Sequence, residues 1–484
     1  MPRSATPRET ADAVQPFFRH PRESGDPVAG DGALALDPRF RGGGEGCSMT
    51  TLVDFPVKPE ARPYLDAFAE CASEPQWLRR ARRASLNRFA EQGFPSRHSE
   101  AWRYLDLRDL QEKPLLPVAP HRLDAAIRGQ LDSLDLLAGA HRLVFVDGCF
   151  SPVLSARDGL PDGAWLGPIS AAIVARPELV RDALDDRVDG AFAALNAAFF
   201  ADGFVLDVAP GVVLDRPIQI IHFAATGGSA HTRSLVNLGA GSRATLVETY
   251  AGEGGAYWRN DVVDVRLGDG AALDRTVLVE EGGEAVHLSD TQAVLGAGAR
   301  FSSFALLLAG RTVRHEIAVT MAGEGAHCTL DGAFVVGGQD EANIVTAVDH
   351  RAPGGTTREL FKGVAAGRGH GAFQGKIGVR EGAQQTDAKQ TSRNLILGRR
   401  ATIDTKPELE IFADDVKCAH GASVGDLDEA ALFYLRARGI ATDEARRLLV
   451  EGFVREAVER VGDPAVRERL LSRLAVRLAQ LETE

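Results

Sequence analysis

Several marks of common protein classes are missing from this chain of 484 residues. Its five cysteines are dispersed and none forms a CxxC pair, so they do not indicate a disulfide framework. No apolar run approaches the roughly 18 residues that a membrane-spanning helix needs. The N-terminus also lacks the apolar segment of a signal peptide. We therefore expect a soluble, cytoplasmic protein. The cysteines are Cys47, Cys71, Cys149, Cys328 and Cys418.

The net charge and the length of the chain exclude further classes of protein. The formal net charge is −12, and no long run of Lys or Arg offsets it. This balance argues against nonspecific binding to nucleic acid. A chain of 484 residues usually folds into two or three domains and can bury a large core.

Residues 1–48 differ from the rest of the chain. They are rich in Pro, Gly and Arg and show no periodicity, so they cannot bury enough apolar surface to offset their ordering entropy. We predict a disordered leader here. Ordinary sequence begins at Met49, which is a candidate for the true start. A transit peptide is the alternative, but the acidic residues and the missing amphipathic pattern disfavour it.

Helical and strand signals alternate over residues 49–203, which we assign to an N-terminal helical and mixed domain. Apolar residues recur at helical spacing in 61–92. The segment HRLVFV, 141–146, predicts a strand. A further helical face carries Phe192 and Leu195 and ends at Asp202-Gly203.

The sequence pattern of residues 204–417 predicts a β-solenoid. Helical spacing disappears, and short β-branched runs alternate with Gly-rich turns. Gly-x-Gly recurs at steps of 29, 28 and 27 residues. A fixed period in this range, with strands and no helix inside it, predicts coils that stack on their neighbours. The pairs are Gly239/Gly241, Gly268/Gly270, Gly296/Gly298 and Gly323/Gly325, and Gly367/Gly369 continues the pattern after an insertion.

These glycines do not indicate a nucleotide site. A dinucleotide fingerprint needs GxGxxG between a strand and a helix, whereas strands follow these pairs. Gly375-Lys376 resembles part of a P-loop, but His370 and Ile377 stand where glycine and Ser/Thr are required. We therefore expect no ATP site in this chain. The histidines of the region are dispersed and are expected at surface or hydrogen-bonded positions: His222, His231, His287, His315, His327, His350 and His370.

Residues 418–484 return to helical spacing. Asp426 can cap a first helix, and Leu470, Leu474 and Leu478 give the last helix an apolar stripe. Two interpretations are compatible: a helical cap over the open end of the solenoid, and a docking surface for another protein.

Cys418 and His420 form the candidate metal site. In an extended strand residues i and i+2 point the same way, so the thiolate and the imidazole could bind one iron, zinc or iron–sulfur cluster. Two ligands do not close a tetrahedral site. The remaining ligands must come from elsewhere in the chain or from a partner.

Three segments around this site resemble a known family. They are TDAKQTSRNLIL (386–397), TKPELEIFADDVKCAHGASVG (405–425) and ALFYLRARGI (431–440). They are similar to the signature of the SufB/SufD family of iron–sulfur cluster assembly proteins. The short N-terminal part and the lack of clustered cysteines place the chain closer to the SufD branch.

The resemblance implies a mainly β fold, a right-handed parallel β-helix core flanked by helical domains. It implies a non-enzymatic scaffold that works with a SufB-like subunit through the β-helix and with a SufC-like ATPase through the C-terminal helices. Cys418 and His420 match the family's Cys-x-His motif at the SufB–SufD interface, which implies iron or a transient cluster there. A reduced flavin is associated with such complexes, and no site for it can be placed in this sequence.

Three alternatives remain. A β-helix carbohydrate-active enzyme would need paired carboxylates in an aromatic cleft, but aromatic residues make up only 6% of the chain. A left-handed β-helix acyltransferase would need hexapeptide repeats. A zinc-dependent structural protein would be distinguished by bound zinc without iron or sulfide.

Overall fold

A computed structural model describes residues 56–481 except 119–124, 133, 135–136, 186–189 and 254. The predicted leader, residues 1–48, lies outside the described residues, as do Met49 and Cys47. No helix in the described part of the chain is long and apolar enough to cross a membrane.

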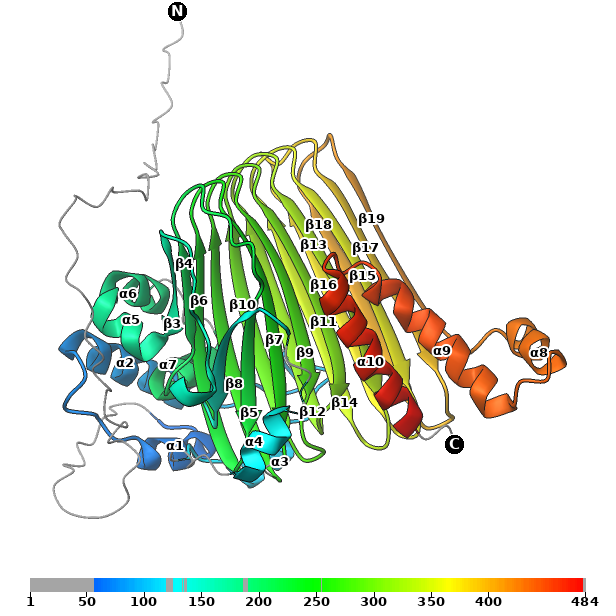
Figure 1. Ribbon diagram of the computed structural model, residues 1–484, viewed down its shortest axis with the longest axis horizontal. Helices are drawn as coiled ribbons and strands as arrows, with labels where there is room; N and C mark the ends of the chain where they lie inside the picture. The colour runs from blue at the N-terminus through cyan, green and yellow to red at the C-terminus, as the bar shows by residue number, and fades with distance from the viewer. Residues whose placement is uncertain are drawn as a thin grey trace, which may run out of the picture. The chain divides into compact units, whose positions relative to one another are not determined.

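Two sheets, of ten and nine strands, face each other and form a parallel β-solenoid (Figure 1). Strands of the ten-stranded sheet are β1 (His141–Val146), β2 (Cys149–Phe150), β5 (Ile218–Ala224), β7 (Arg243–Gly252), β9 (Ala272–Glu280), β11 (Arg300–Ala309), β13 (His327–Val336), β15 (Thr356–Ala365), β17 (Asp387–Ile396) and β19 (Lys417–Gly425). Strands of the nine-stranded sheet are β3 (Ala164–Pro168), β4 (Phe204–Val208), β6 (Gly228–Leu238), β8 (Tyr257–Leu267), β10 (Val286–Leu295), β12 (Thr312–Met321), β14 (Glu341–His350), β16 (His370–Val379) and β18 (Thr402–Ile411).

Successive strands from β4 to β19 alternate between the sheets and make about eight turns. Each pairs in parallel with the strand one coil away, while β1–β2 and β3–β4 pair antiparallel. The apolar core lies between the sheets and includes Leu246, Phe301 and Ile377. The predicted parallel β-helix with helical ends is confirmed.

The Gly-x-Gly turns show why the period is fixed. The first glycine lies against the turn of the preceding coil: a Cβ at Gly268 would be 2.8 Å from the backbone nitrogen of Ala240. The second glycine has a left-handed backbone, with φ of 66° at Gly270. Residues other than glycine rarely adopt this conformation. Both positions therefore exclude a Cβ, for different reasons.

The assignment of Gly367/Gly369 to this series is wrong. That pair lies between β15 and β16, at the opposite turn of the coil. The series continues instead at Gly354, whose φ is 70° and whose N–H donates to the carbonyl of Gln384 in the next coil. Both turns of a coil are tight and contain glycine, so a glycine in the sequence does not show at which of the two turns it lies.

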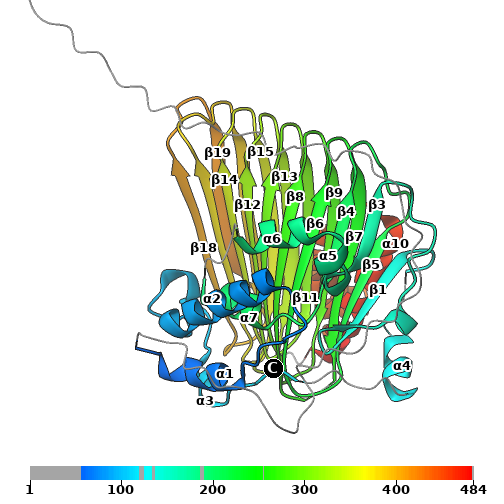
Figure 2. The same cartoon turned by 90° about the vertical axis from the view of Figure 1, so that its left-hand side faces the viewer.

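The N-terminal helices cover the outer face of the nine-stranded sheet (Figure 2). An aromatic cluster joins them to it: Phe94 and Phe192 pack on Trp258 of β8, with ring centroids 6.0 and 5.3 Å away. The helices are α1 (Arg62–Ala67), α2 (Gln76–Gln92), α3 (Arg108–Glu112), α5 (Ile169–Ala175), α6 (Pro177–Asp185) and α7 (Ala191–Phe199). The remaining helix of this region, α4 (Ala125–Asp132), packs on β1 and β5 of the ten-stranded sheet instead.

The C-terminal helices are α8 (Glu429–Ala437), α9 (Thr442–Val458) and α10 (Pro464–Gln480). Val454 of α9 and Leu474 of α10 are buried against Leu306 and other residues of the ten-stranded sheet. These two helices therefore cover the side of the solenoid, and the expectation of a cap over its open end is wrong. Residues 418–425, expected in the helical domain, form most of β19 instead.

Candidate functional site

The candidate site lies on β19, at the end of the ten-stranded sheet. β19 pairs in parallel with β17, with Cys418 opposite Ala388 and His420 opposite Gln390. The N–H of Lys417 donates to the carbonyl of Thr386 on the β17 side. Because successive residues of a parallel strand alternate their hydrogen-bonding direction, the backbone groups of residues 418, 420, 422 and 424 point toward the free edge.

The last coil exposes apolar surface that earlier coils bury. Val379 on β16 is fully buried, whereas its register neighbour Ile411 on β18 is 41% exposed. Phe412 and Val424 are 59% and 42% exposed. An unpaired edge with exposed apolar side chains is typical of a surface that another chain covers.

Cys418 and His420 share one face of β19. Cys418 is half-buried and packs against the solenoid core, while His420 is exposed. Since their side chains point the same way, both are directed toward the interior side at its open end. Burial raises the pKa of the Cys418 thiol, although the backbone N–H of Ala388 partly lowers it. A metal binding there would have to displace the thiol proton.

These two residues do not make a complete metal site. Within the part of the chain that the structure describes, no group of three or more His, Cys, Asp or Glu side chains could hold a metal ion. Cys328 is buried in the core, where burial raises the pKa of its thiol well above its usual range. It is therefore core rather than ligand. Among the described residues, Cys418 and His420 therefore have no third side-chain ligand beside them.

Most of the solenoid's histidines are buried, four of them on strand faces directed between the two sheets and His231 on the outer face of β6 beside Phe199 of α7. Five of the seven histidines are buried rather than at the surface, and four have a hydrogen-bond partner while His222 stacks 4.8 Å from the Tyr250 ring. Burial lowers the pKa of His231 and of His315 to about 3, so both are neutral near pH 7. The five are His222, His231, His287, His315 and His350.

A buried ionic cluster on and beside β8 was missed at the sequence level. Glu281 accepts hydrogen bonds from Tyr257 (2.6 Å), Arg259 (2.7 Å) and His287 (2.9 Å). Burial alone would raise the pKa of Glu281, but the Arg259 guanidinium and the bond with His287 lower it to about 2. The alternation of side-chain direction along β8 could have shown that Arg259 points inward. It could not have shown that its partner is Glu281, which lies in the loop after β9.

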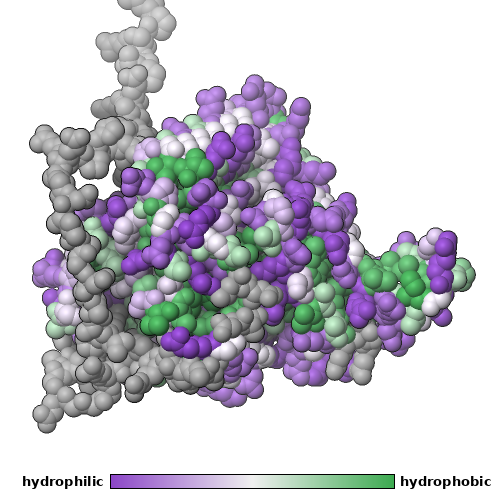
Figure 3. All heavy atoms as spheres, viewed as in Figure 1, coloured by the Kyte–Doolittle hydropathy of each residue, from purple (hydrophilic) through white to green (hydrophobic). Residues whose placement is uncertain are grey.

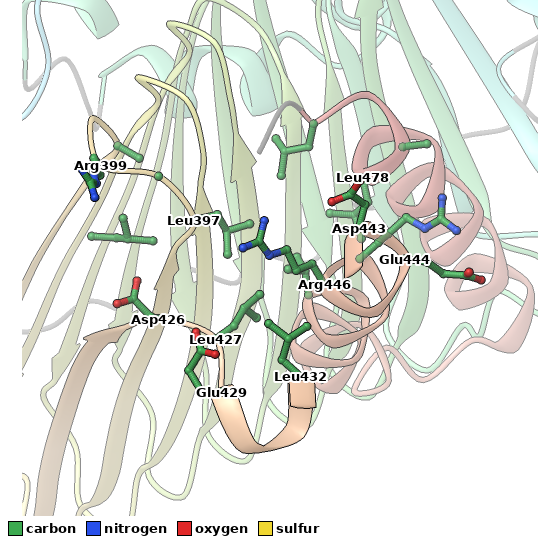
Figure 4. A pocket seen from close by; sticks show the side chains of 17 residues that line it. Leu397, Arg399, Asp426, Leu427, Glu429, Leu432, Asp443, Glu444, Arg446 and Leu478 are labelled. Atoms are coloured by element: carbon green, nitrogen blue, oxygen red, sulfur yellow. The ribbon is translucent and has the colours of Figure 1, made fainter. Parts of the chain in front are cut away.

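A pocket of about 910 Å³ opens where the turn after β17 meets the C-terminal helices (Figure 4). Leu397, Leu427 and Leu432 give it an apolar wall, and Arg446 reaches into it from α9. Beyond the pocket, α8 projects away from the sheets (Figure 1). Its Phe433 and Tyr434 are 72% and 57% exposed, and apolar residues gather on this projecting part of the surface (Figure 3).

Two family models match consecutive parts of the chain. The model of the SufBD protein N-terminal region matches residues 64–220, and that of the SUF system FeS cluster assembly SufBD core domain matches residues 221–453. These two matches do not support a flavin cofactor, and we assign no flavin site.

Curated relatives agree with these models. The iron–sulfur cluster assembly protein SufD of Escherichia coli is 28% identical over 399 residues, which covers 81% of this chain and 91% of that protein. Protein ABCI7, chloroplastic, of Arabidopsis thaliana is 28% identical over 84% of this chain and 87% of its own length. The Bacillus subtilis SufD is 26% identical over 84% of this chain and 96% of its own length. The chain thus belongs to the SufBD family of iron–sulfur cluster assembly proteins and is SufD-like within it.

Proposed function

We propose that this chain is a non-enzymatic scaffold subunit of an iron–sulfur cluster assembly complex. Its partners are a SufB-like subunit, which pairs with the open end of the β-helix, and a SufC-like ATPase, which binds the C-terminal helices. Iron or a nascent cluster is the cargo. The observation that carries the proposal is the position of Cys418 and His420 on β19, the edge strand of the ten-stranded sheet, whose outer edge pairs with no strand in the described part of the chain.

The SufB-like partner would supply a neighbouring strand for β19, a cover for the exposed apolar side chains and further metal ligands. A second β-helix of this family can add a strand to β19 and cover the apolar side chains at residues 411, 412 and 424. The same contact would bring further ligands to Cys418 and His420. A thiolate and an imidazole from this chain, with ligands from the partner, suit iron or an iron–sulfur cluster.

The SufC-like partner would bind the projecting α8. Aromatic side chains are enriched at protein interfaces, and Phe433 and Tyr434 are exposed there. Because α9 and α10 are buried against β7, β9, β11, β13 and β15 of the ten-stranded sheet, a pull on α8 would be transmitted to the sheet that ends in β19. ATP-driven closure of the ATPase could thereby open the interface that holds the cargo.

Replacement of Ala422 by proline tests the pairing at β19. The N–H of Ala422 points to the free edge, so Ala422→Pro removes a donor that the chain itself does not use, as edge strands tolerate. Proline inside a newly formed ladder removes one hydrogen bond and leaves the partner's carbonyl unpaired. Such a loss costs about 1–3 kcal/mol, so we expect affinity for the SufB-like subunit to fall about 10- to 100-fold. The measurement is titration of the two purified subunits.

Ala422→Ser keeps the N–H and serves as the matched control, with affinity expected to be unchanged. Binding of the SufC-like ATPase to Ala422→Pro should also persist, because Ala422 lies on β19 and outside the helices α8–α10 to which the ATPase is proposed to bind. Unchanged affinity of Ala422→Pro for the SufB-like subunit would show that β19 is not the interface.

A further inference from the structure

Buried polar side chains lead through the solenoid toward His420. Thr346 on β14 donates its hydroxyl to Oε2 of Glu359 on β15 over 3.0 Å. Nε2 of Gln390 on β17 donates to the same oxygen over 2.8 Å. In the sheet register, Gln390 lies between Glu359 and His420. This polar chain therefore reaches the strand beside the candidate iron ligand.

The Gln390 amide has an unused acceptor. Its side chain is fully buried, and among the residues that the structure describes its Oε1 has no hydrogen-bond partner. The fold makes room for this amide, because a Cβ at Gly375 on the opposite sheet would overlap it. A buried carbonyl oxygen without a donor is costly, so a donor that reached Oε1 in the assembled state would stabilise this arrangement.

We infer that Gln390 is the positioning residue of His420, accepting the imidazole N–H at Oε1 while Glu359 holds its amide group. The inference rests on the proposed function. A histidine that binds metal through one ring nitrogen usually donates its other N–H to a protein oxygen, which fixes the tautomer and the ring orientation. Neighbouring parallel strands are about 4.8 Å apart, so register neighbours such as Gln390 and His420 are within reach of one hydrogen bond.

The test is an anaerobic titration of ferrous iron into the purified three-subunit complex, with a competing chelator. Work at pH 8 keeps Glu359 mostly ionised, since burial raises the pKa of this carboxyl to about 7 despite its bonds with Gln390 and Thr346. Gln390→Leu removes the acceptor, and we expect iron affinity to fall about 10- to 100-fold. If this variant does not assemble, Glu359→Leu with Gln390→Leu removes the acceptor without leaving an unpaired carboxylate.

Two controls separate positioning from general damage. Ser392→Ala changes another buried polar residue of β17, which faces Ala422 instead of His420, and affinity should not change. The reciprocal pair, Glu359→Gln with Gln390→Glu, reverses donor and acceptor but keeps an oxygen for His420. It should restore affinity to within a few-fold of the original.

The outcomes of this titration distinguish the inference about Gln390 from the proposed function on which it rests. Unchanged affinity in Gln390→Leu, with iron lost in His420→Ala, would overturn the inference and leave the proposed function standing. A loss in Gln390→Leu that the reciprocal pair does not restore would also overturn it. Retention of iron by His420→Ala would overturn the proposed iron site at Cys418 and His420, on which this inference rests, whereas failure of the three subunits to associate would overturn the proposed function.

Discussion

Gly323→Ala is expected to destabilise the solenoid by about 3 kcal/mol, a cost typical of strong overpacking. A Cβ at Gly323 would lie closer than 3 Å to the backbone of Gly296 and Ala297 in the preceding coil. Backbone cannot move aside as a flexible side chain can, so adjacent coils would have to separate locally. Thermal unfolding of both proteins under the same conditions measures the difference.

Gly382→Ala is the matched control for this substitution. Gly382 lies in a turn between β16 and β17, and a Cβ there would meet no atom within 4 Å. The unfolding midpoint of this variant should stay close to that of the original chain. Equal midpoints for Gly323→Ala and Gly382→Ala would show that close contact between turns does not set the coil period.

Glu281→Ala should cost about 3–5 kcal/mol, because it leaves a buried charge without its counter-ion. The Arg259 and Glu281 side chains are 1% and 0% exposed. Arg259 would keep a long hydrogen bond of 3.4 Å to the carbonyl of Ala251 and its position over the Tyr250 ring, 5.6 Å from the ring centroid. His287 and Tyr257 would also lose their shared acceptor. Chemical denaturation gives the difference in the free energy of unfolding.

Two comparisons isolate the buried charge. Asp66→Ala breaks the exposed Arg62–Asp66 pair on α1, and exposed pairs contribute less than about 1 kcal/mol. Arg259→Met with Glu281→Leu removes both charges and should be less destabilising than Glu281→Ala alone. A loss of under 1 kcal/mol in Glu281→Ala would mean that water reaches this cluster.

The repeat could be predicted because each coil imposes the same backbone demands. Gly268 must lack a Cβ because it contacts the preceding coil, and Gly270 because its φ is left-handed. The spacing of such glycines in the sequence therefore shows the period of the coils. The C-terminal helices could be predicted from their stripes. The surface that they cover could not, because Leu470, Leu474 and Leu478 would form the same stripe against a solenoid end or a sheet face.

The polar interior could not be predicted for a different reason. Alternation along a strand separates its two faces but does not say which face is inside. On β17, Ala388, Gln390, Ser392 and Asn394 all point inward, and three of the four are polar. The importance of Gln390 depends on its neighbours Glu359 and His420, which are about 30 residues away on adjacent coils.

The central claim is that Cys418 and His420 hold iron at an interface with a SufB-like subunit. The most direct measurement is co-expression of this chain with SufB-like and SufC-like subunits, anaerobic purification, and analysis of iron and sulfide. We expect the complex to form with Cys418→Ala plus His420→Ala, but with its iron content and cluster formation reduced to near background. A complex of the double variant with unchanged iron and unchanged cluster formation would contradict the claim.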